Sequence, residues 1–427
     1  MKIIKNPPEN TWVSLCKRPV LDKSELDDVV KEIIRNVRES GDNALREYSL
    51  RFDKINTWEF KVSEREIAES SDLIPETLKS AIDIAKNNIE YFHSPQLVDE
   101  EPVETAPGVI CWRESVPIEK VGLYIPGGTA PLFSTILMLG VPARIAGCKQ
   151  IVLCTPPDSN GKINPAILYT AGLLGILDIY KVGGAQAIGA MAYGTESIPK
   201  VYKIFGPGNQ YVNKAKELVQ IEGIAIDLPA GPSEVLVIAD QNAKPDFVAA
   251  DLLSQAEHGS DSQVVLLTDN ENLALNVEKE IKKQLAVLPR KELAGKSIGN
   301  SFSVVLDSLD DCMEFSNLYA PEHLIINTKN FDLLANKVEN AGSVFLGPYS
   351  CESAGDYASG TNHTLPTNGY AVAYSGVSTD SFLKKITFQQ VTGKGILILG
   401  PVISIMAEAE NLQAHSNAVK VRINSLK

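Results

Sequence analysis

VGLYIPGGTAPLFSTILMLGVPARIAGCKQIVLCTPPDSNGKINPAILYTAGLLGILDIYKV, residues 121–182, alternates between two kinds of segment. Short apolar strands are expected at Val121–Ile125, Gln150–Thr155 and Asp178–Val182, and helical stretches lie between them near Pro131–Leu139 and Pro165–Leu174. Alternation of this kind predicts a parallel sheet that is covered by helices on both faces.

The same alternation continues toward the C-terminus. Further strands are expected at Lys203–Phe205, Ala225–Asp227, Val235–Ala239, Gln263–Leu267, Ser303–Leu306, His323–Asn327 and Ser343–Leu346, with helical stretches between them. The chain is therefore expected to be an α/β protein.

The flanking segments have a different texture. Residues 1–20 are expected to be irregular because prolines interrupt them. Apolar residues at helical spacing predict helices between 24 and 91. The tail predicts a helix near Val402–Gln413 and an alternating strand at Val419–Ile423.

Length and charge limit the classes of function. A chain of 427 residues is typical of two to three domains. Hydrophobic residues make up 44% and charged residues 22%, both typical of globular proteins. The net charge of −13 argues against nucleic acid or an anionic membrane as the main partner, since either favours a basic surface.

The sequence shows no targeting signal, so a cytoplasmic protein is expected. The N-terminus, MKIIKNPPENTW, lacks the apolar core of a signal peptide. The longest apolar run, residues 395–407, falls well short of the ~20 residues that a membrane-spanning helix needs. The six cysteines are scattered without CxxC spacing, which predicts a reduced protein without a disulfide framework or a zinc ribbon.

Candidate catalytic side chains gather after residue 250. Gln255 and His258 are three residues apart on an expected helix, so they share a face and could offer an oxygen and a nitrogen to a metal. Such a spacing also arises at ordinary helix ends. Glu322 and His323 lie between a helix and a strand, where open α/β folds place active sites at strand ends, and could supply two bases. An ordinary loop is the alternative.

A second group of candidates follows. Residues 349–376 have no apolar period, and a loop of this length is usually functional. Asp356 and His363 give that loop a carboxylate and an imidazole. In the tail, Glu410 and His415 would reach a site only by folding back or from another subunit; the alternative is a solvated terminal helix. Two imidazoles, a carboxylate and an amide could together bind one divalent cation with a position open for substrate.

Glycine turns provide a candidate nucleotide site. Phe205-Gly-Pro-Gly-Asn209 follows a strand and opens a helix, which suits a phosphate or a ribose. The third glycine of G-x-G-x-x-G would fall at Tyr211, so the dinucleotide fingerprint is broken. Similar turns at Pro126–Gly128 and Gly183–Gln186 could line the same crevice.

Seven motifs occur in order along the chain: VGLYIPGGTAPLFST, VGGAQAI, KIFGPGN, DLPAGPSEVLVIAD, DLLSQAEHGSDSQV, PEHLII and SAGDYASGTNH. They resemble the signatures of the histidinol dehydrogenase family over nearly the whole chain, except the first 20 residues and the stretch around 393–401. The resemblance implies oxidation of L-histidinol to L-histidine through L-histidinal in two NAD-dependent steps, the last steps of histidine biosynthesis.

The resemblance also implies roles for individual residues. Glu322 and His323 would be the catalytic bases. The ligands of a Zn²⁺ ion would be Gln255, His258, Asp356 and His415. The substrate would contact these ligands, His323, Ser233, His363 and Glu410, and NAD would contact Tyr124, Gln186 and Asn209.

The implied architecture has two incomplete Rossmann-like domains, one inserted in the other, with small terminal segments. The expected division is an N-terminal segment 1–20, a first domain of 21–123 and 235–377 with the metal and catalytic residues, a second domain 124–234 on the NAD side, and a C-terminal segment 378–427. The C-terminal segment is expected to complete the partner's site in a homodimer, which would explain Glu410 and His415 in the tail.

Other functions remain open from the residues alone. A zinc hydrolase would use Glu322 as the base for a metal-bound water, and a non-catalytic protein would bind a metal or nucleotide without turnover. A related dehydrogenase would act on another amino alcohol or a sulfonate. Cys111 and Cys148 could be thiol nucleophiles, but they are better interpreted as small buried apolar residues.

Overall fold

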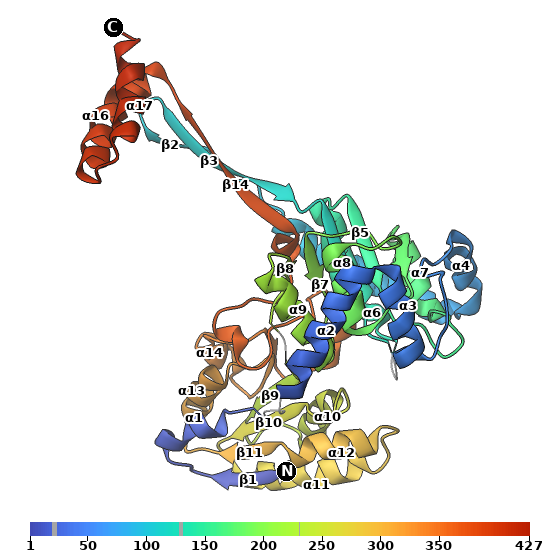
Figure 1. Ribbon diagram of the computed structural model, residues 1–427. Helices are drawn as coiled ribbons and strands as arrows, with labels where there is room; N and C mark the ends of the chain where they lie inside the picture. Colours follow the sequence, from blue (N-terminus) through green and yellow to red (C-terminus); the bar gives the residue numbers. More distant parts are fainter. Residues whose placement is uncertain (19–23, 128–130, 230) are drawn as a thin grey trace.

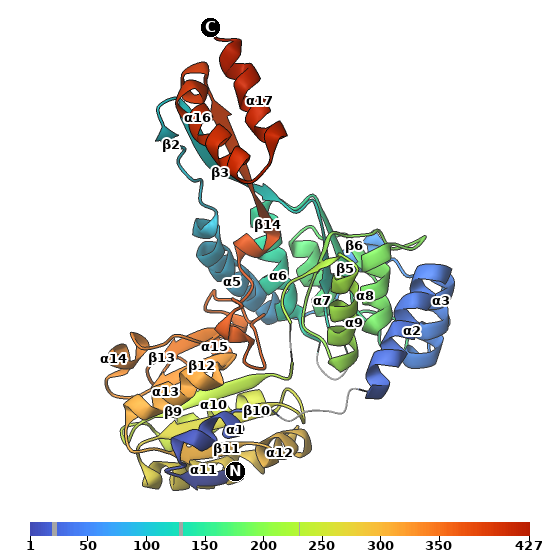
Figure 2. The same cartoon turned by 60° about the vertical axis from the view of Figure 1, so that its left-hand side comes forward.

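The computed structural model describes residues 1–18, 24–127, 131–229 and 231–427. Two α/β bodies lie side by side, and an arm projects away from both of them and carries the C-terminus (Figures 1 and 2).

The first body contains a sheet with the order β1-β11-β10-β9-β12-β13, named the large sheet. Its strands are β1 (Lys2–Lys5), β9 (Glu234–Ala239), β10 (Gln263–Thr268), β11 (Phe302–Val305), β12 (His323–Asn327) and β13 (Ser343–Leu346). All neighbours are parallel. Every residue of β9, β10 and β12 is buried, as expected for strands that helices cover on both faces.

Helices enclose the large sheet. The apolar contacts of one face are with α10 (Pro245–Ala256), α11 (Glu271–Leu285) and α12 (Lys291–Gly299), and those of the other with α1 (Trp12–Leu15), α13 (Leu309–Tyr319) and α14 (Phe331–Ala335). The last helix of this body, α15 (Glu352–Tyr357), follows β13.

The second body contains a parallel sheet with the order β6-β5-β4-β7-β8, named the second sheet. Its strands are β4 (Lys120–Tyr124), β5 (Gln150–Cys154), β6 (Asp178–Tyr180), β7 (Lys203–Phe205) and β8 (Ala225–Ile226). The helices α5 (Glu76–His93), α6 (Phe133–Ala146) and α7 (Pro165–Leu173) cover one face, and α2 (Ser24–Ser40), α3 (Asp42–Tyr48), α8 (Gly184–Tyr193) and α9 (Gln210–Ile221) the other. The predicted α/β class is confirmed.

The chain passes from one body to the other and back. The chain starts in the large sheet with β1, builds the second sheet, and returns to the large sheet at β9. The helices α2 and α5, expected in the first domain with 235–377, pack against the second sheet. Sequence periodicity identifies the apolar face of a helix but not the sheet that covers it.

Residues 1–18, the described part of the segment 1–20, are less irregular than expected. Ile3 and Ile4 belong to β1, which pairs in parallel with β11 at the edge of the large sheet. Lys2 and Lys5 flank them, and charged residues are typical of edge strands. Four residues are too few to show a periodic pattern, so this strand was not predicted.

The arm is an antiparallel sheet with the order β14-β3-β2, topped by two helices (Figure 2). Its elements are β2 (Val103–Ala106), β3 (Val109–Pro117), β14 (Leu383–Val391), α16 (Gly393–Ala409) and α17 (Gln413–Asn424). The predicted strand at 419–423 is wrong, because these residues are helical. A side chain at Gly400 would collide with Val419 and Ile423, which are four residues apart and therefore lie on one face of α17 against α16.

Although α16 is rich in apolar residues, no helix in the described part of the chain combines the length and the hydropathy of a membrane span.

Candidate functional site

A cleft of about 920 Å³ lies between the two bodies. Glu234 and His323 are the first residues of β9 and β12, so the large sheet contributes the amino ends of its strands. The second sheet contributes the segments after β4 and β7, including Pro126 and Pro207. Strand ends of both sheets therefore border the cleft, amino ends in the large sheet and carboxyl ends in the second sheet. The predicted residues that line the cleft are Asn209, Ser233, Gln255, His258, Glu322, His323, Asp356 and His363.

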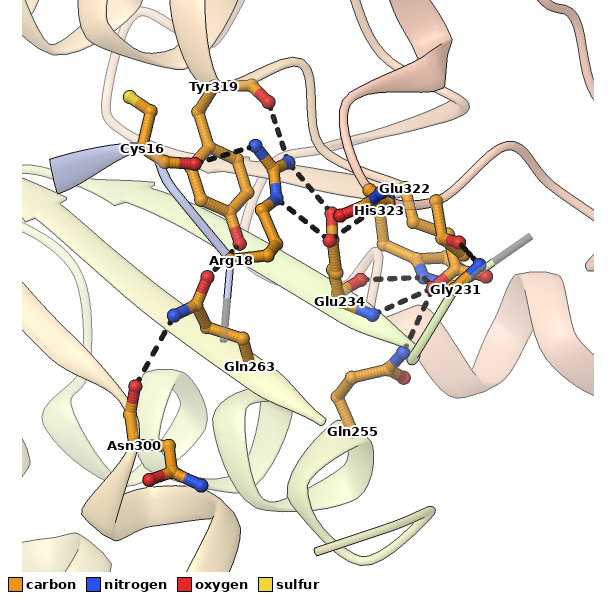
Figure 3. Close-up of polar contacts among 12 residues, drawn as sticks. Cys16, Arg18, Gly231, Glu234, Gln255, Gln263, Asn300, Tyr319, Glu322 and His323 are labelled. Atoms are coloured by element: carbon orange, nitrogen blue, oxygen red, sulfur yellow. Dashed lines mark hydrogen bonds and ion pairs between the residues drawn. The ribbon is translucent and has the colours of Figure 1, made fainter. Parts of the chain in front are cut away.

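Glu322 and His323 are both buried and both held by the backbone of Glu234 (Figure 3). The Glu234 N–H donates to Oε2 of Glu322 at 2.7 Å. Nδ1 of His323 lies 3.1 Å from the carbonyl oxygen of Glu234. Because a carbonyl only accepts, Nδ1 must carry the proton, and Nε2 is left for other chemistry.

Nε2 of His323 has no full hydrogen bond within the described residues although it is buried. Its nearest charged neighbour is Oδ1 of Asp356 at 3.5 Å, longer than a good hydrogen bond. A buried nitrogen that lacks a partner is costly unless a ligand supplies one. His323 therefore presents a nitrogen toward the place where a substrate can bind.

Burial and crowding shift the pKa values in this cluster. Burial raises the pKa of Glu322 to about 8 and that of Glu352 to about 8. Burial alone would lower the pKa of His323, but the carboxylates of Glu322, Glu352 and Asp356 overcome this effect and raise it to about 10. Several carboxylates share one buried region, so a cation there would be stabilised electrostatically.

Three side chains could hold a metal ion. One ligand atom from each of His258, Glu352 and Asp356 lies within 4.8 Å of the others. Glu352 was not predicted. It precedes Asp356 by four residues on α15, so the two carboxylates lie on one side of the helix, and this i, i+4 spacing was the available signal.

Gln255 lies between the carboxylates of Glu322 and Glu352. In one orientation its amide nitrogen donates to Glu322 at 3.3 Å and its oxygen faces Glu352. In the other, the nitrogen donates to Glu352 and the oxygen accepts from the Glu234 N–H at 2.9 Å. The second orientation satisfies the amide with protein partners alone, whereas the first leaves its oxygen available to a metal ion. The oxygen and nitrogen donors of this cluster therefore fit a divalent metal such as Zn²⁺.

His363 joins the two bodies at the cleft. Its Nδ1 lies 2.9 Å from the carbonyl oxygen of Asp356, and its Nε2 lies 3.1 Å from Oγ1 of Thr135 at the start of α6. Both ring nitrogens are thus engaged, which fits an orienting role beside Asp356 better than proton transfer.

The turn after β7, where the sequence analysis expects a nucleotide, is tightly built. The side chain of Asn209 caps α9 by accepting from the N–H groups of Tyr211 and Val212 at 3.0 and 3.1 Å. Gly206 has φ +126°, and a Cβ there would collide with the carbonyl oxygen of Tyr124. Glycine is therefore required for the close approach of the β7 turn to β4.

A buried ion pair fixes the same turn. Nζ of Lys216 donates to the Gly206 carbonyl at 2.9 Å, and Oδ2 of Asp227 accepts from the Gly206 N–H at 2.8 Å. Lys216 and Asp227 pair with each other at 2.5 Å, and both side chains are almost fully buried.

Tyr124 and Gln186 are buried and do not line the described walls of the cleft. The Tyr124 hydroxyl accepts from the Gly184 N–H at 3.1 Å, and burial raises the pKa of Tyr124 to about 12. Their predicted contact with NAD stays a prediction.

Glu410 and His415 lie at the far end of the arm, in the turn after α16 and in α17 (Figures 1 and 2). Within one chain they do not approach the cluster, and both are exposed. A role for either residue requires a second chain, as the sequence analysis expects.

The cysteines do not form a reactive site in the described residues. Cys148 is buried, and burial raises its pKa to about 11, so its thiol stays protonated. Cys111 lies on β3 of the arm, away from the cleft.

Comparisons with known proteins agree on one family. A family profile described as histidinol dehydrogenase matches residues 16–423. The chain is 60% identical over 427 residues to a histidinol dehydrogenase of Bacteroides thetaiotaomicron, with 100% of both chains covered. The chain belongs to the histidinol dehydrogenase family.

Further relatives of this family agree. A histidinol dehydrogenase of Escherichia coli O6:H1 is 53% identical over 416 residues, covering 97% of this chain and 95% of that protein. The crystal structure of histidinol dehydrogenase from Elizabethkingia anophelis matches with a TM-score of 0.98 and 58% identity, covering 100% of this chain and 98% of that chain. The resemblance seen in the motifs is confirmed, and the chain is an NAD-dependent oxidoreductase of this class.

Proposed function

We propose that the cleft oxidises L-histidinol to L-histidine through L-histidinal, with two NAD⁺ reduced per substrate and one zinc ion bound, as the last steps of histidine biosynthesis. For the imidazole-bearing alcohol R–CH₂OH, the balance is R–CH₂OH + 2 NAD⁺ + H₂O → R–COO⁻ + 2 NADH + 3 H⁺. Family membership supports the reaction class.

One observation carries the chemical part of the proposal. Nε2 of His323 is buried, lacks a full hydrogen bond within the described chain, and faces the group formed by His258, Glu352 and Asp356. A proton acceptor beside a cluster of metal-ligating side chains is what oxidation of a coordinated alcohol requires.

The zinc ligands we propose are Gln255, His258 and Asp356, with His415 of a second subunit. When bound, the metal would orient the substrate so that its alcohol carbon meets the nicotinamide, the acceptor of both hydrides. Glu352, beside Gln255 and four residues before Asp356, would balance the metal's charge or become an additional ligand.

In the first oxidation, Nε2 of His323 takes the proton of the substrate hydroxyl. The Glu234 carbonyl holds Nδ1–H, which fixes the ring so that Nε2 points into the cleft. The side chains of Ser233 and His363 line the same cleft and orient the substrate, together with Glu410 of a second subunit.

In the second oxidation, Glu322 takes a proton from the water that attacks the aldehyde carbon. Its Oε2 accepts from the Glu234 N–H, which directs the carboxylate, and its raised pKa makes it a stronger base than an exposed glutamate. Keeping the aldehyde bound between the two steps protects it from side reactions.

The homodimer is also a proposal. Large apolar side chains are exposed on α16 at the end of the arm: Leu397, Ile398, Val402, Ile405 and Met406. An exposed apolar patch marks an interaction surface. If two copies pack through this patch, the Glu410 and His415 of each copy would lie near the cleft of the other. Mixing a His258→Asn chain with a His415→Asn chain should restore part of the activity in heterodimers. No recovery after proven subunit exchange would contradict shared sites.

A cytoplasmic location is proposed because the cysteines are free, including the exposed Cys351.

The test of the function is the ratio of NADH formed to L-histidinol consumed, followed at the absorbance band of reduced nicotinamide, with L-histidine identified as product. Two NADH per substrate support the proposal. One NADH and release of the aldehyde would limit the activity to a simple alcohol dehydrogenase, and hydrolysis or binding without NADH would favour the hydrolase or the non-catalytic alternative. Turnover of another amino alcohol only would change the substrate.

A further inference from the structure

A buried ion pair between Arg18 and Glu234 lies beside the two proposed bases at the edge of the cleft (Figure 3). Nε and Nη2 of Arg18 each lie 2.9 Å from a carboxylate oxygen of Glu234, in a bidentate arrangement. The side chain of Glu234 is 1% exposed and that of Arg18 is 11% exposed. The pair joins the N-terminal segment to the first residue of β9.

Arg18 also contacts two backbone carbonyls and an aromatic ring. Its Nη2 donates to the carbonyl oxygen of Tyr319 at 2.6 Å and its Nη1 to that of Cys16 at 3.0 Å. Its guanidinium carbon lies 3.6 Å from the centre of the Tyr319 ring. Tyr319 is the last residue of α13 and Cys16 directly follows α1. The guanidinium therefore binds the C-terminal ends of two helices of the large-sheet body.

Glu234 is in turn fixed by Arg18 and by the backbone of Asn368, whose N–H donates to Oε1 at 3.0 Å. The backbone of Glu234 contacts both bases, through its N–H to Glu322 and its carbonyl to His323. The orientation of this one residue therefore sets where both proposed bases point.

Stability gives little reason for such a pair. Two buried charges lose much of their hydration, and a well-packed apolar pair of the same volume is often equally stable. What a bidentate Arg–carboxylate pair supplies beyond packing is a defined direction.

We propose that Arg18 and Glu234 form a positioning pair that aligns Glu322 and His323 through the backbone of Glu234. This inference rests on the proposed function for the role of the two bases. It assigns a part in the chemistry to the N-terminal segment, although Arg18 transfers no proton.

The test compares Arg18→Met, Arg18→Lys and the double variant Arg18→Met/Glu234→Gln in the full-length protein. Arg18→Met should lower kcat by about 100-fold with little change in KM for L-histidinol, because small misplacements of catalytic groups carry losses of this size. Arg18→Lys should recover only part of kcat, since an ammonium cannot form the fork. The double variant removes the unpaired charge, so it should recover thermal stability but not kcat.

A matched control is Lys181→Met, which breaks the partly buried pair with Glu66 at 2.6 Å, a contact that lies outside the cleft. It should lose stability and keep kcat.

A second readout does not depend on turnover. With ¹⁵N-histidine labelling, the Nδ1–H signal of His323, assigned by its loss in His323→Asn, should shift or broaden in Arg18→Met and stay unchanged in Lys181→Met. Wild-type kcat in Arg18→Met, recovery of kcat in the double variant, or an unchanged His323 signal would each overturn the positioning role. If the wild-type protein did not oxidise L-histidinol, the proposed function would fail and the His323 signal alone would decide the inference.

Discussion

Nε2 of His323 lies 3.5 Å from Oδ1 of Asp356. The proposed base and a proposed metal ligand are therefore close enough for a strong electrostatic interaction. The Asp356 carboxylate helps to raise the pKa of His323, and His323 in return lowers the pKa of Asp356 against the effect of burial. A cation on Asp356 would reduce its hold on the imidazolium, so metal binding would bring His323 closer to the neutral form that accepts a proton.

Replacing His323 by Asn should separate chemistry from metal binding. The variant loses the proton acceptor but keeps the ligand group of His258, Glu352 and Asp356. We expect kcat to fall by about 10²–10⁴-fold, the usual contribution of a general base. Zinc content, measured by atomic emission on the purified protein, should not change. Loss of zinc in this variant would make His323 a ligand instead of a base.

Glu322→Gln should impair the second oxidation more than the first. The amide keeps the acceptor oxygen for the Glu234 N–H but cannot take a proton from water. With L-histidinal supplied as substrate, the rate should fall by about 10²–10⁴-fold. Single-turnover formation of the first NADH from L-histidinol should change far less. Equal losses in both steps would refute the division of roles between Glu322 and His323.

The pair of Lys216 and Asp227 should govern cofactor binding. Lys216→Met/Asp227→Leu removes both buried charges together and frees the Gly206 peptide that they hold. We expect KM for NAD⁺ to rise by about tenfold, equivalent to ~1.4 kcal/mol, with KM for L-histidinol unchanged. Arg38→Met, which breaks an exposed pair with Glu222 beyond the other end of α9, is the control. A larger rise in KM for L-histidinol than in KM for NAD⁺ would show that the cofactor binds elsewhere.

The stability of the second body should depend on pH through Glu66. This residue completes the capping box of α4 (Glu64–Glu69) with Ser63 and pairs with Lys181. Burial opposes ionisation, but the Lys181 and Ser63 contacts prevail and lower the pKa of Glu66. A lowered folded-state pKa gives stability that is present above the unfolded pKa, about 4.3, and is lost as the pH falls through the folded value.

Glu66→Gln keeps an oxygen that can complete the capping box but loses the ion pair with Lys181, so it should cost about 0.5–1 kcal/mol at pH 7. The difference from wild type should be smaller at pH ~3.5 than at pH 7, because the contribution declines once the pH falls below the unfolded pKa. Urea unfolding at the two pH values measures it. A difference that grew on acidification would show that the ionised form of Glu66 does not stabilise the fold.

Much of the fold could be predicted because apolar strands buried on both faces leave a continuous signal. Every strand expected between 121 and 346 is present at its predicted place. The strands of the arm were missed since β14 is largely exposed and β3 is mostly half-buried, so neither has the pattern that burial imposes. Val419 and Ile423 fit both a strand and one face of a helix, and the packing against Gly400 selects the helix.

Part of the site was predictable. Motif resemblance identified eight residues that line the cleft, whereas the contacts among them depend on tertiary structure. Glu234 was missed because its function lies in its backbone, and Arg18 because its partner is 216 residues away. Neither relationship leaves a local trace in the sequence.

The most direct test of the account is anomalous diffraction at the zinc edge from crystals of the zinc-loaded protein. We expect one peak per subunit, enclosed by Gln255, His258 and Asp356 of one chain and by His415 of a second. A map without a peak there, or with the zinc bound away from Asp356, would contradict the account.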